Sequence, residues 1–271
     1  MNTLCNNFPN KVQLSLAAYP GLSFGEALVT AHSTPPSEPL WGPLSMEQVQ
    51  LCPQNAGHLS EDLVWQLRED FSEPRFRLHA NVRVLPNRQV ADLADWSDSQ
   101  TYFSALAKVS HMLGATGYSA HAGSREHTTL QRLIEYAKAA NDLFDCPVGI
   151  EGHYPTLNNR YLVDSWSEYQ AVFESGVPYA VDLSHLNILV SRTHRREDGL
   201  VAEMLNCERC MEVHVSDNDG VGDTHQTLNV APWWYPLMRH VHPEAVIFSE
   251  GNQRRKAVPR QGRQPNDEQA H

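Results

Sequence analysis

The chain lacks the long hydrophobic runs of a membrane protein and the cysteine pattern of a secreted one. No stretch approaches the ~20 uninterrupted apolar residues that span a bilayer. The five cysteines are odd in number and have no framework spacing, which argues against disulfides and for a reducing compartment. The segment from Met1 to Phe8 has no basic residue and does not resemble a secretory signal. We therefore expect a cytoplasmic protein without a membrane segment.

Positive charge is also scarce. The net charge is −11, and five of the 21 Lys and Arg residues lie between Asn252 and His271. An acidic body repels phosphate backbones, which argues against a nucleic-acid substrate and favours a small polar molecule. The stretch 252–271 has no periodicity, so we expect a single domain over 1–251 followed by a disordered polar and basic tail. The composition is compatible with a homo-oligomer and leaves the oligomeric state open.

One cysteine pair has the spacing of a metal or redox motif. Cys207 and Cys210 form a C-x-x-C pattern, but no second pair accompanies them and a strand, not a helix, is expected to follow. A chance or surface thiol pair is therefore favoured over a redox site.

Six short apolar runs, each ending on a side chain that can bind metal, recur at intervals of about 30 to 40 residues. They are Phe76–His79, Tyr118–His121, Val148–Glu151, Tyr179–Asp182, Met211–His214 and Val246–Glu250.

This interval is the length of one strand, one helix and two loops. Helical periodicity between the runs, at 101–113 and 130–143, supports alternating strands and helices. We predict a single α/β domain, a (β/α)8 TIM barrel, with a metal site where the carboxyl ends of the strands meet.

Several further elements are expected from local signals. Val12–Leu16 is predicted as the first strand, and Ser33–Pro43 as a long proline-rich loop near which the second strand cannot be placed. Ser60 is predicted to cap a helix, and Ser165 with Glu168 to form a capping box for a helix that ends at Gly176. Short helices are expected around 200–205 and over 232–241.

Four of the strand ends carry a core set of three carboxylates and one imidazole. A single acid at a strand end is often an ordinary helix cap, but four at equivalent positions favour a metal site. Such ligands suit Mn²⁺, Mg²⁺, Fe²⁺ or Zn²⁺. The set is Glu151, Asp182, His214 and Glu250.

Five more residues extend this set to nine candidates: His79, His121, His185, Asp223 and His225. One ion needs about four to six ligands, so the sequence is compatible with one to three ions per chain. Asp217 and Asp219 are interpreted as loop acids that cap backbone amides, although either could reach the site. Four other histidines are interpreted as bystanders: His127, His153, His194 and His242.

These phrases together resemble the xylose isomerase-like TIM barrels, which include sugar phosphate isomerases and epimerases and the endonuclease IV type of AP endonuclease (family 2). The resemblance runs from about Ser60 to Glu250. It rests on six phrases in the same order and spacing: Phe76–His79, His121–Ser124, Ile150–Glu151, Val181–His185, His214–Gly220 with Asp223–His225, and Ser249–Glu250.

The resemblance implies two different roles for the candidates. In the epimerases, residues matching Glu151, Asp182, His214 and Glu250 hold one ion, and the two glutamates transfer a proton as acid and base. In the nucleases, all nine positions hold three zinc ions. The first role implies an isomerase or epimerase acting on a polyhydroxy or carbonyl substrate, and the second a phosphoester hydrolase. We favour the first weakly, because the chain is acidic.

The sequence also departs from these patterns. After His225, the segment beginning at Gln226 replaces a Gly-Glu-Gly turn that many relatives carry. A third branch, the multinuclear non-haem iron oxidases that modify peptides or small molecules, shares the Asp-Thr-His phrase, but His185 stands where an Asn is expected. Trp233 and Trp234 are interpreted either as pocket lining or as packing for the last helix.

Overall fold

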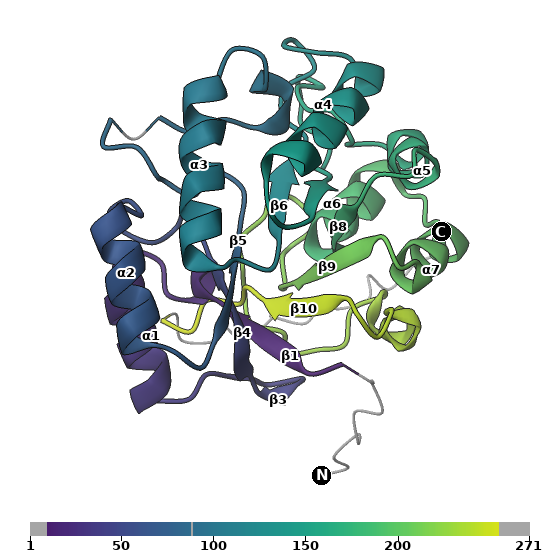
Figure 1. The fold of residues 1–271 in the computed structure, drawn as a ribbon. Helices are drawn as coiled ribbons and strands as arrows, with labels where there is room; N and C mark the ends of the chain where they lie inside the picture. Colours follow the sequence, from purple (N-terminus) through teal and green to yellow (C-terminus); the bar gives the residue numbers. More distant parts are fainter. Residues whose placement is uncertain (1–9, 88, 255–271) are drawn as a thin grey trace, which may run out of the picture.

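The computed structural model describes residues 10–87 and 89–254 and forms a closed barrel (Figure 1). All eight barrel strands pair in parallel, in the order β1-β10-β9-β8-β7-β6-β5-β4, which confirms the predicted (β/α)8 fold. The expected tail lies, from residue 255 onward, outside the described residues. The barrel strands are β1 (Val12–Ser15), β4 (Ser45–Leu51), β5 (Arg75–Leu78), β6 (Tyr118–His121), β7 (Val148–Glu151), β8 (Tyr179–Asp182), β9 (Cys210–Val215) and β10 (Val246–Ser249).

Helices surround the barrel and pack their apolar faces on it (Figure 1). The α-helices are α1 (Phe24–Ser33), α2 (Glu61–Asp70), α3 (Gln100–Leu113), α4 (Leu130–Leu143), α5 (Trp166–Glu174), α6 (Leu183–Thr193) and α7 (Asp198–Asn206). The 3₁₀ helices are η1 (Leu16–Ala18), η2 (Leu93–Asp95) and η3 (Tyr235–His240).

The second barrel strand is β4, which follows the proline-rich loop. It escaped prediction because Glu47, Gln48 and Gln50 interrupt its apolar pattern. Gln50 is nevertheless fully buried, and its amide bonds inside the barrel. The loop before β4 contains a small antiparallel pair, β2 (Ser37–Glu38) and β3 (Gly42–Pro43).

Two predicted helix boundaries are confirmed, and one predicted capping box is not formed. Ser60 caps α2 by accepting the Leu63 N–H, and α3 stops at Gly114, whose φ of 65° is left-handed. The capping box at Ser165 does not form, because Glu168 pairs with Arg125 instead.

Three further details correct the sequence reading. Helix α5 ends at Glu174, not at Gly176. The helix expected over 232–241 is the 3₁₀ helix η3, whose first turn contains Pro236. Helix α6 was not predicted at all, although its cap residue, Asp182, was already a site candidate.

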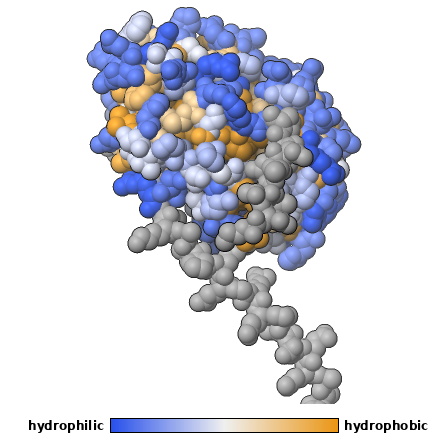
Figure 2. Space-filling model, turned by 90° about the horizontal axis from the view of Figure 1, so that it is seen from below, coloured by the Kyte–Doolittle hydropathy of each residue, from blue (hydrophilic) through white to orange (hydrophobic). Residues whose placement is uncertain are grey.

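The described surface carries both hydrophilic and hydrophobic residues. On the face seen from below, hydrophilic residues dominate the outline and hydrophobic residues gather near the middle (Figure 2). No helix in the described ranges is long and apolar enough to cross a membrane.

Candidate metal centre

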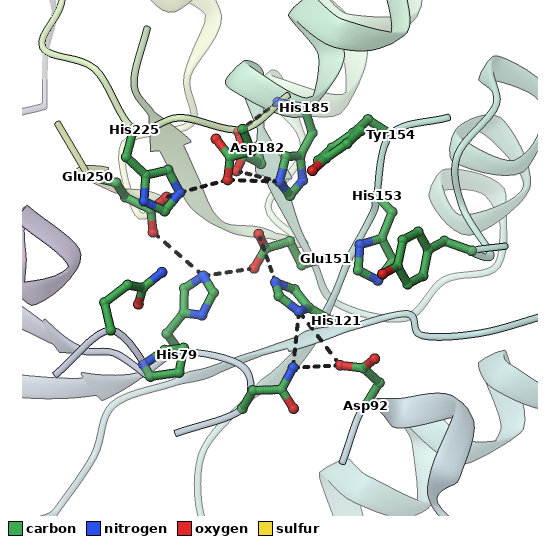
Figure 3. A pocket seen from close by; sticks show the side chains of 15 residues that line it. His79, Asp92, His121, Glu151, His153, Tyr154, Asp182, His185, His225 and Glu250 are labelled. Carbon is green, nitrogen blue, oxygen red and sulfur yellow. Dashed lines mark hydrogen bonds and ion pairs between the residues drawn. The ribbon is translucent and has the colours of Figure 1, made fainter. Parts of the chain in front are cut away.

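The nine predicted ligand residues converge at the carboxyl ends of the strands. Figure 3 shows how His79, His121, Glu151, Asp182, His185, His225 and Glu250 lie around one cavity. All nine residues except His214 line this cavity of about 310 Å³. His214 lies in β9, is fully buried and belongs to the same cluster of potential ligands. The structure therefore brings together side chains that are up to 171 positions apart, from His79 to Glu250.

The potential ligand atoms form three adjoining groups, in each of which the atoms lie within 4.8 Å of one another. His79 belongs to two groups, and so does Glu151. The groups are His79, His214 and Glu250; His79, His121 and Glu151; and Glu151, Asp182 and His185.

Glu151 lies at the centre of the cluster. Its carboxylate oxygens are 3.3 Å from His214 Nδ1, 3.5 Å from His79 Nε2 and 3.8 Å from His121 Nε2. Glu250 lies beside it, with Oε1 3.5 Å from His79 Nε2. Both side chains are at most 2% exposed.

Unsatisfied polar atoms at this point fit a divalent ion. Both carboxylate oxygens of Glu151, Oε1 of Glu250 and Nδ1 of His214 are buried without a hydrogen-bond partner among the described residues. Buried groups of this kind are costly unless something satisfies them. A cation bound between them would satisfy all four, so the donor set fits a metal.

The outer nitrogens of three histidines face acceptors of the protein. His79 Nδ1 lies 3.1 Å from the Ala80 carbonyl, and His185 Nδ1 lies 2.8 Å from the Gly152 carbonyl. His121 Nδ1 lies 3.6 Å from Asp92 Oδ1. Because these contacts hold the rings by Nδ1, the Nε2 atoms are turned toward the cluster.

Two loops complete the cavity wall. Asp182 caps α6 through Oδ1, and its Oδ2 lies 3.4 Å from His185 Nε2. Asp223 Oδ2 lies 2.6 Å from His225 Nε2 and 3.6 Å from His185 Nε2. His225 Nε2 also lies 3.5 Å from Glu250, which links this loop to the central cluster.

The electrostatics of the metal-free cluster are those of carboxylates paired with imidazolium ions. Burial opposes the charge of Glu151, but His214 and His79 hold its pKa well below the usual range. Burial likewise opposes the protonation of His185, but Asp182 and Asp223 raise its pKa to about 10. The pKa of His225 rises to about 9 against burial, chiefly through its bond to Asp223.

His153 is not a remote bystander, because it forms part of the cavity wall. Its ring stacks on Tyr161 at 4.2 Å, and its Nε2 accepts the Gly123 N–H at 3.2 Å. Burial and the neighbouring His121 lower its pKa to about 3, so it is neutral. Its position two residues after Glu151 is the sequence signal that could have placed it at the site.

The other predicted bystander histidines and the two loop aspartates lie away from the cavity. His127 pairs with Asp95 on the surface, and His194 ends α6 with a left-handed φ of 54°. Asp217 and Asp219 both accept backbone N–H groups, as expected. His242 Nδ1 accepts the Glu244 N–H. None of these three histidines and two aspartates lines the cavity.

Trp233 and Trp234 do not line the cavity either. Trp234 is buried in the hydrophobic core, and Trp233 packs against it under the Arg196 guanidinium. The packing interpretation is therefore the correct one. Cys210 is a buried free thiol whose pKa is raised by burial, which disfavours a redox pair with Cys207.

Sequence reasoning missed several polar residues that support the ligands. They carry no recognisable motif: Gln50, Asn81, Asp92 and Glu212. Of these, only Glu212 lies in one of the six apolar runs, two residues before His214.

Solved structures share this fold over nearly the whole chain. A D-tagatose 3-epimerase-like protein matches with a TM-score of 0.62 and 14% identity, over 89% of this chain and 90% of that one. An AP endonuclease of family 2 from Brucella melitensis matches with a TM-score of 0.61 and 12% identity, over 91% and 95%. The IOLI protein with a binding zinc atom matches with a TM-score of 0.58 and 11% identity, over 90% of both chains.

These likenesses show the fold, which this chain shares with proteins named as epimerases, as an AP endonuclease and as a xylose isomerase domain protein. It is the fold that the sequence resemblance implies. No family model and no curated protein matches the sequence.

Proposed function

We propose that the protein is a divalent-metal-dependent enzyme with two or three ions in its centre, acting on a small polar substrate by hydrolysis. The observation that carries this proposal is the convergence of seven ligand-type side chains into three adjoining groups that share His79 and Glu151, with Asp223 and His225 lining the same cavity. Proteins of the same fold named as epimerases, as an AP endonuclease and as a zinc-bound protein support an enzyme and a metal.

One feature favours more than one ion, and a second disfavours isomerisation. A single ion takes about four to six ligands, fewer than the cluster supplies. His79 Nε2 also lies 3.5 Å from Glu151 and 3.5 Å from Glu250. In a proton-transferring isomerase, the two glutamates reach the substrate carbon from opposite sides. Here an imidazole stands between them, which shifts our preference from isomerisation to hydrolysis.

Bound divalent ions in such a centre activate water and polarise an ester or phosphoester oxygen. The side chains of this chain would hold and orient the reactants. His79, His121 and Glu151 would hold one ion, and Asp182, His214 and Glu250 would complete a second site with Glu151. Asp223 and His225 would hold a third with His185. Neutral His153 accepts the Gly123 N–H through Nε2, so its Nδ1–H can donate to a substrate.

The residues that line the cavity and its volume support the proposed substrate class. No Lys or Arg is among the described residues that line it, so a substrate anion would be neutralised by the ions alone. A cavity of about 310 Å³ suits a small molecule. Both features support a small ester or phosphoester and argue against a nucleic-acid duplex.

An isomerase or epimerase is the second candidate. It is favoured by the carboxylates of Glu151 at the end of β7 and Glu250 after β10, which reach one cavity and keep buried oxygens without hydrogen-bond partners in the described chain. With a single ion bound, these two groups would exchange a substrate C–H proton with solvent.

Elemental analysis of protein purified anaerobically, without added metal or chelator, tests the proposal. Two or three zinc or manganese ions per chain, with cleavage of p-nitrophenyl phosphoesters that His121→Ala abolishes, would support hydrolysis. One ion, with solvent deuterium exchange lost in Glu250→Gln, would move the assignment to the isomerases. Iron with oxygen consumption would move it to the iron oxidases. A protein that binds no metal would overturn the proposal.

A further inference from the structure

A buried polar chain runs through the barrel interior beneath the proposed metal centre. Such interiors are usually filled by layers of branched apolar side chains. Here Gln50 on β4, Arg77 on β5 and Glu212 on β9 are 0%, 8% and 0% exposed. Polar groups at this depth are costly unless they are paired, so their arrangement calls for a function.

The contacts of this chain end on His214. Glu212 Oε2 lies 2.9 Å from His214 Nε2 and accepts a hydrogen bond from Gln50 Nε2 at 2.9 Å. Gln50 Nε2 also lies 2.9 Å from His214 Nε2, so Glu212 Oε2 is the acceptor that both nitrogens face. Glu212 Oε1 lies 3.0 Å from Arg77 Nη1. Arg77 is itself held by Gln48, which accepts from its Nε at 3.1 Å. Both oxygens of Glu212 are therefore engaged, one by the guanidinium and one by the imidazole.

The backbone around Arg77 and Glu212 is shaped for this arrangement. The register of β8 and β9 shifts so that Met211 is an extra residue directly before Glu212. A Cβ atom on Gly117 would lie 2.7 Å from Arg77 Nη1 and 2.8 Å from Met211 Cε. A side chain at position 117 would therefore require the Arg77 guanidinium or the Met211 methyl group to shift.

His214 differs from the other histidines of the cluster. His79 and His185 are held through Nδ1 by neutral carbonyls, whereas His214 is held through Nε2 by a carboxylate. Its Nδ1 is the atom that faces the cluster, 3.3 Å from Glu151 and 4.0 Å from Glu250. The ring is thus oriented the opposite way round.

We propose that Glu212, held by Arg77 and Gln50, is a positioning residue that keeps the His214 proton on Nε2 and leaves Nδ1 to bind an ion. This inference rests on the proposed metal function. A carboxylate in this place orients the imidazole and makes it a more basic ligand than a carbonyl would. Arg77 acts one step further away, by holding the carboxylate in line with the ring.

The test compares zinc affinity in full-length wild type, Glu212→Gln, Arg77→Met and Arg77→Lys. Zinc dissociation constants come from competition with a chromophoric chelator, and the cobalt-substituted absorption spectrum reports ligand geometry. In Glu212→Gln the amide can donate to Nε2 and reverse the tautomer. We expect zinc binding to weaken about 10- to 100-fold with an altered cobalt spectrum. Arg77→Met should weaken binding less, and Arg77→Lys should restore much of it.

Glu168→Gln is the matched control, because Glu168 is also an ion-paired glutamate, with Arg125, but touches none of the nine ligand candidates. Circular dichroism checks folding of each variant. Folded Glu212→Gln with wild-type zinc affinity and cobalt spectrum would overturn the inference while leaving the proposed function intact, as would equal losses in Glu168→Gln. If Glu212→Gln does not fold, equal affinities of Arg77→Met and Arg77→Lys would overturn it. Wild type that binds no zinc or cobalt would overturn both.

Discussion

At the scale of single residues, the most shared side chain of the centre is Glu151. It lies within 3.8 Å of three histidines and is almost completely buried. A carboxylate has two oxygens, so one such residue can serve two neighbouring ions, which a histidine with one inward nitrogen cannot do. The loss of Glu151 should therefore disturb more of the centre than the loss of any histidine.

Glu151→Gln tests this sharing. We expect the metal content to fall by more than one ion per chain, because the amide removes the negative charge common to two groups. His121→Ala should remove about one ion. Elemental analysis of both variants, beside Glu168→Gln, measures the difference. Equal losses in Glu151→Gln and His121→Ala would contradict a shared carboxylate.

Protonation of the metal-free site predicts a pH dependence. His185 and His225 have pKa values raised to about 10 and about 9, so both carry a proton at pH 7. An ion needs the neutral rings, so metal binding should release protons and tighten as the pH rises toward 9. Calorimetric titration in two buffers of different ionisation enthalpy counts the protons. No proton release at pH 7 would contradict these ligands.

The same shifts affect the stability of the metal-free protein in a defined direction. A histidine with a raised pKa in the folded state stabilises the fold fully below its unfolded value of about 6.5. This contribution is lost as the pH rises through about 9 for His225 and about 10 for His185. As the pH rises toward 9, the metal-free protein should lose unfolding free energy, whereas metal binding should become tighter.

At the scale of elements, one residue both begins a helix and faces the metal centre. Asp182 ends β8 and caps α6, and its Oδ1 accepts from the N–H groups of Ser184 and His185 at 2.7 and 3.0 Å. Its other oxygen points to the His185 ring. Capping also fixes where His185 lies, because that residue is in the first turn of α6.

Two substitutions at this position separate the roles. Asp182→Asn keeps a capping oxygen but removes the negative charge that faces His185, so it should destabilise the metal-free fold through the lost ion pair and strongly weaken metal binding. Asp182→Ala should cost about 1 kcal/mol more through the lost cap. Urea unfolding in the presence of a chelator measures the stabilities. Equal stability of the two variants would contradict the capping role.

Gly117, directly before β6, supplies another prediction at this scale. Gly117→Ala places a methyl group against Arg77 and Met211, and overpacking of this kind costs about 1 to 3 kcal/mol. The control is Gly199→Ala in α7, where a Cβ meets nothing within 4 Å and helix propensity favours alanine. Thermal unfolding should separate the two, and a Gly117→Ala variant as stable as Gly199→Ala would contradict the close approach.

At the scale of the whole molecule, the centre joins elements from one end of the barrel to the other. Its candidates come from β5 through β10 and the loops after them, so a bound ion ties strands that are distant in sequence. An ion that binds only the folded chain stabilises it by mass action.

Metal removal should therefore lower the melting temperature of the wild type. At a free zinc concentration 100 times the dissociation constant, one site contributes about 2.7 kcal/mol, which a chelator removes. Glu151→Gln should show a much smaller difference between zinc and chelator. Scanning calorimetry measures both proteins, and an unchanged melting temperature of the wild type in chelator would contradict a centre that binds in the folded state.

Much of the fold was readable from local pattern. The six apolar runs ending at His79, His121, Glu151, Asp182, His214 and Glu250 are all barrel strands or strand ends. The strand β4 was not readable, because Gln48 and Gln50 serve polar contacts inside the barrel. Helix α6 was overlooked because its first residues were interpreted only as ligands.

The sequence by itself determined most of the alternation of strands and helices, the ligand types and the face on which they meet, because strand ends recur at a nearly fixed interval and side-chain chemistry is local. Only the tertiary structure decided how the ligands group. The shared position of Glu151, the inward Nδ1 of His214 and its support by Glu212 and Arg77 depend on closing the barrel. Closure brings together atoms whose spacing along the chain carries no record of their distance in space.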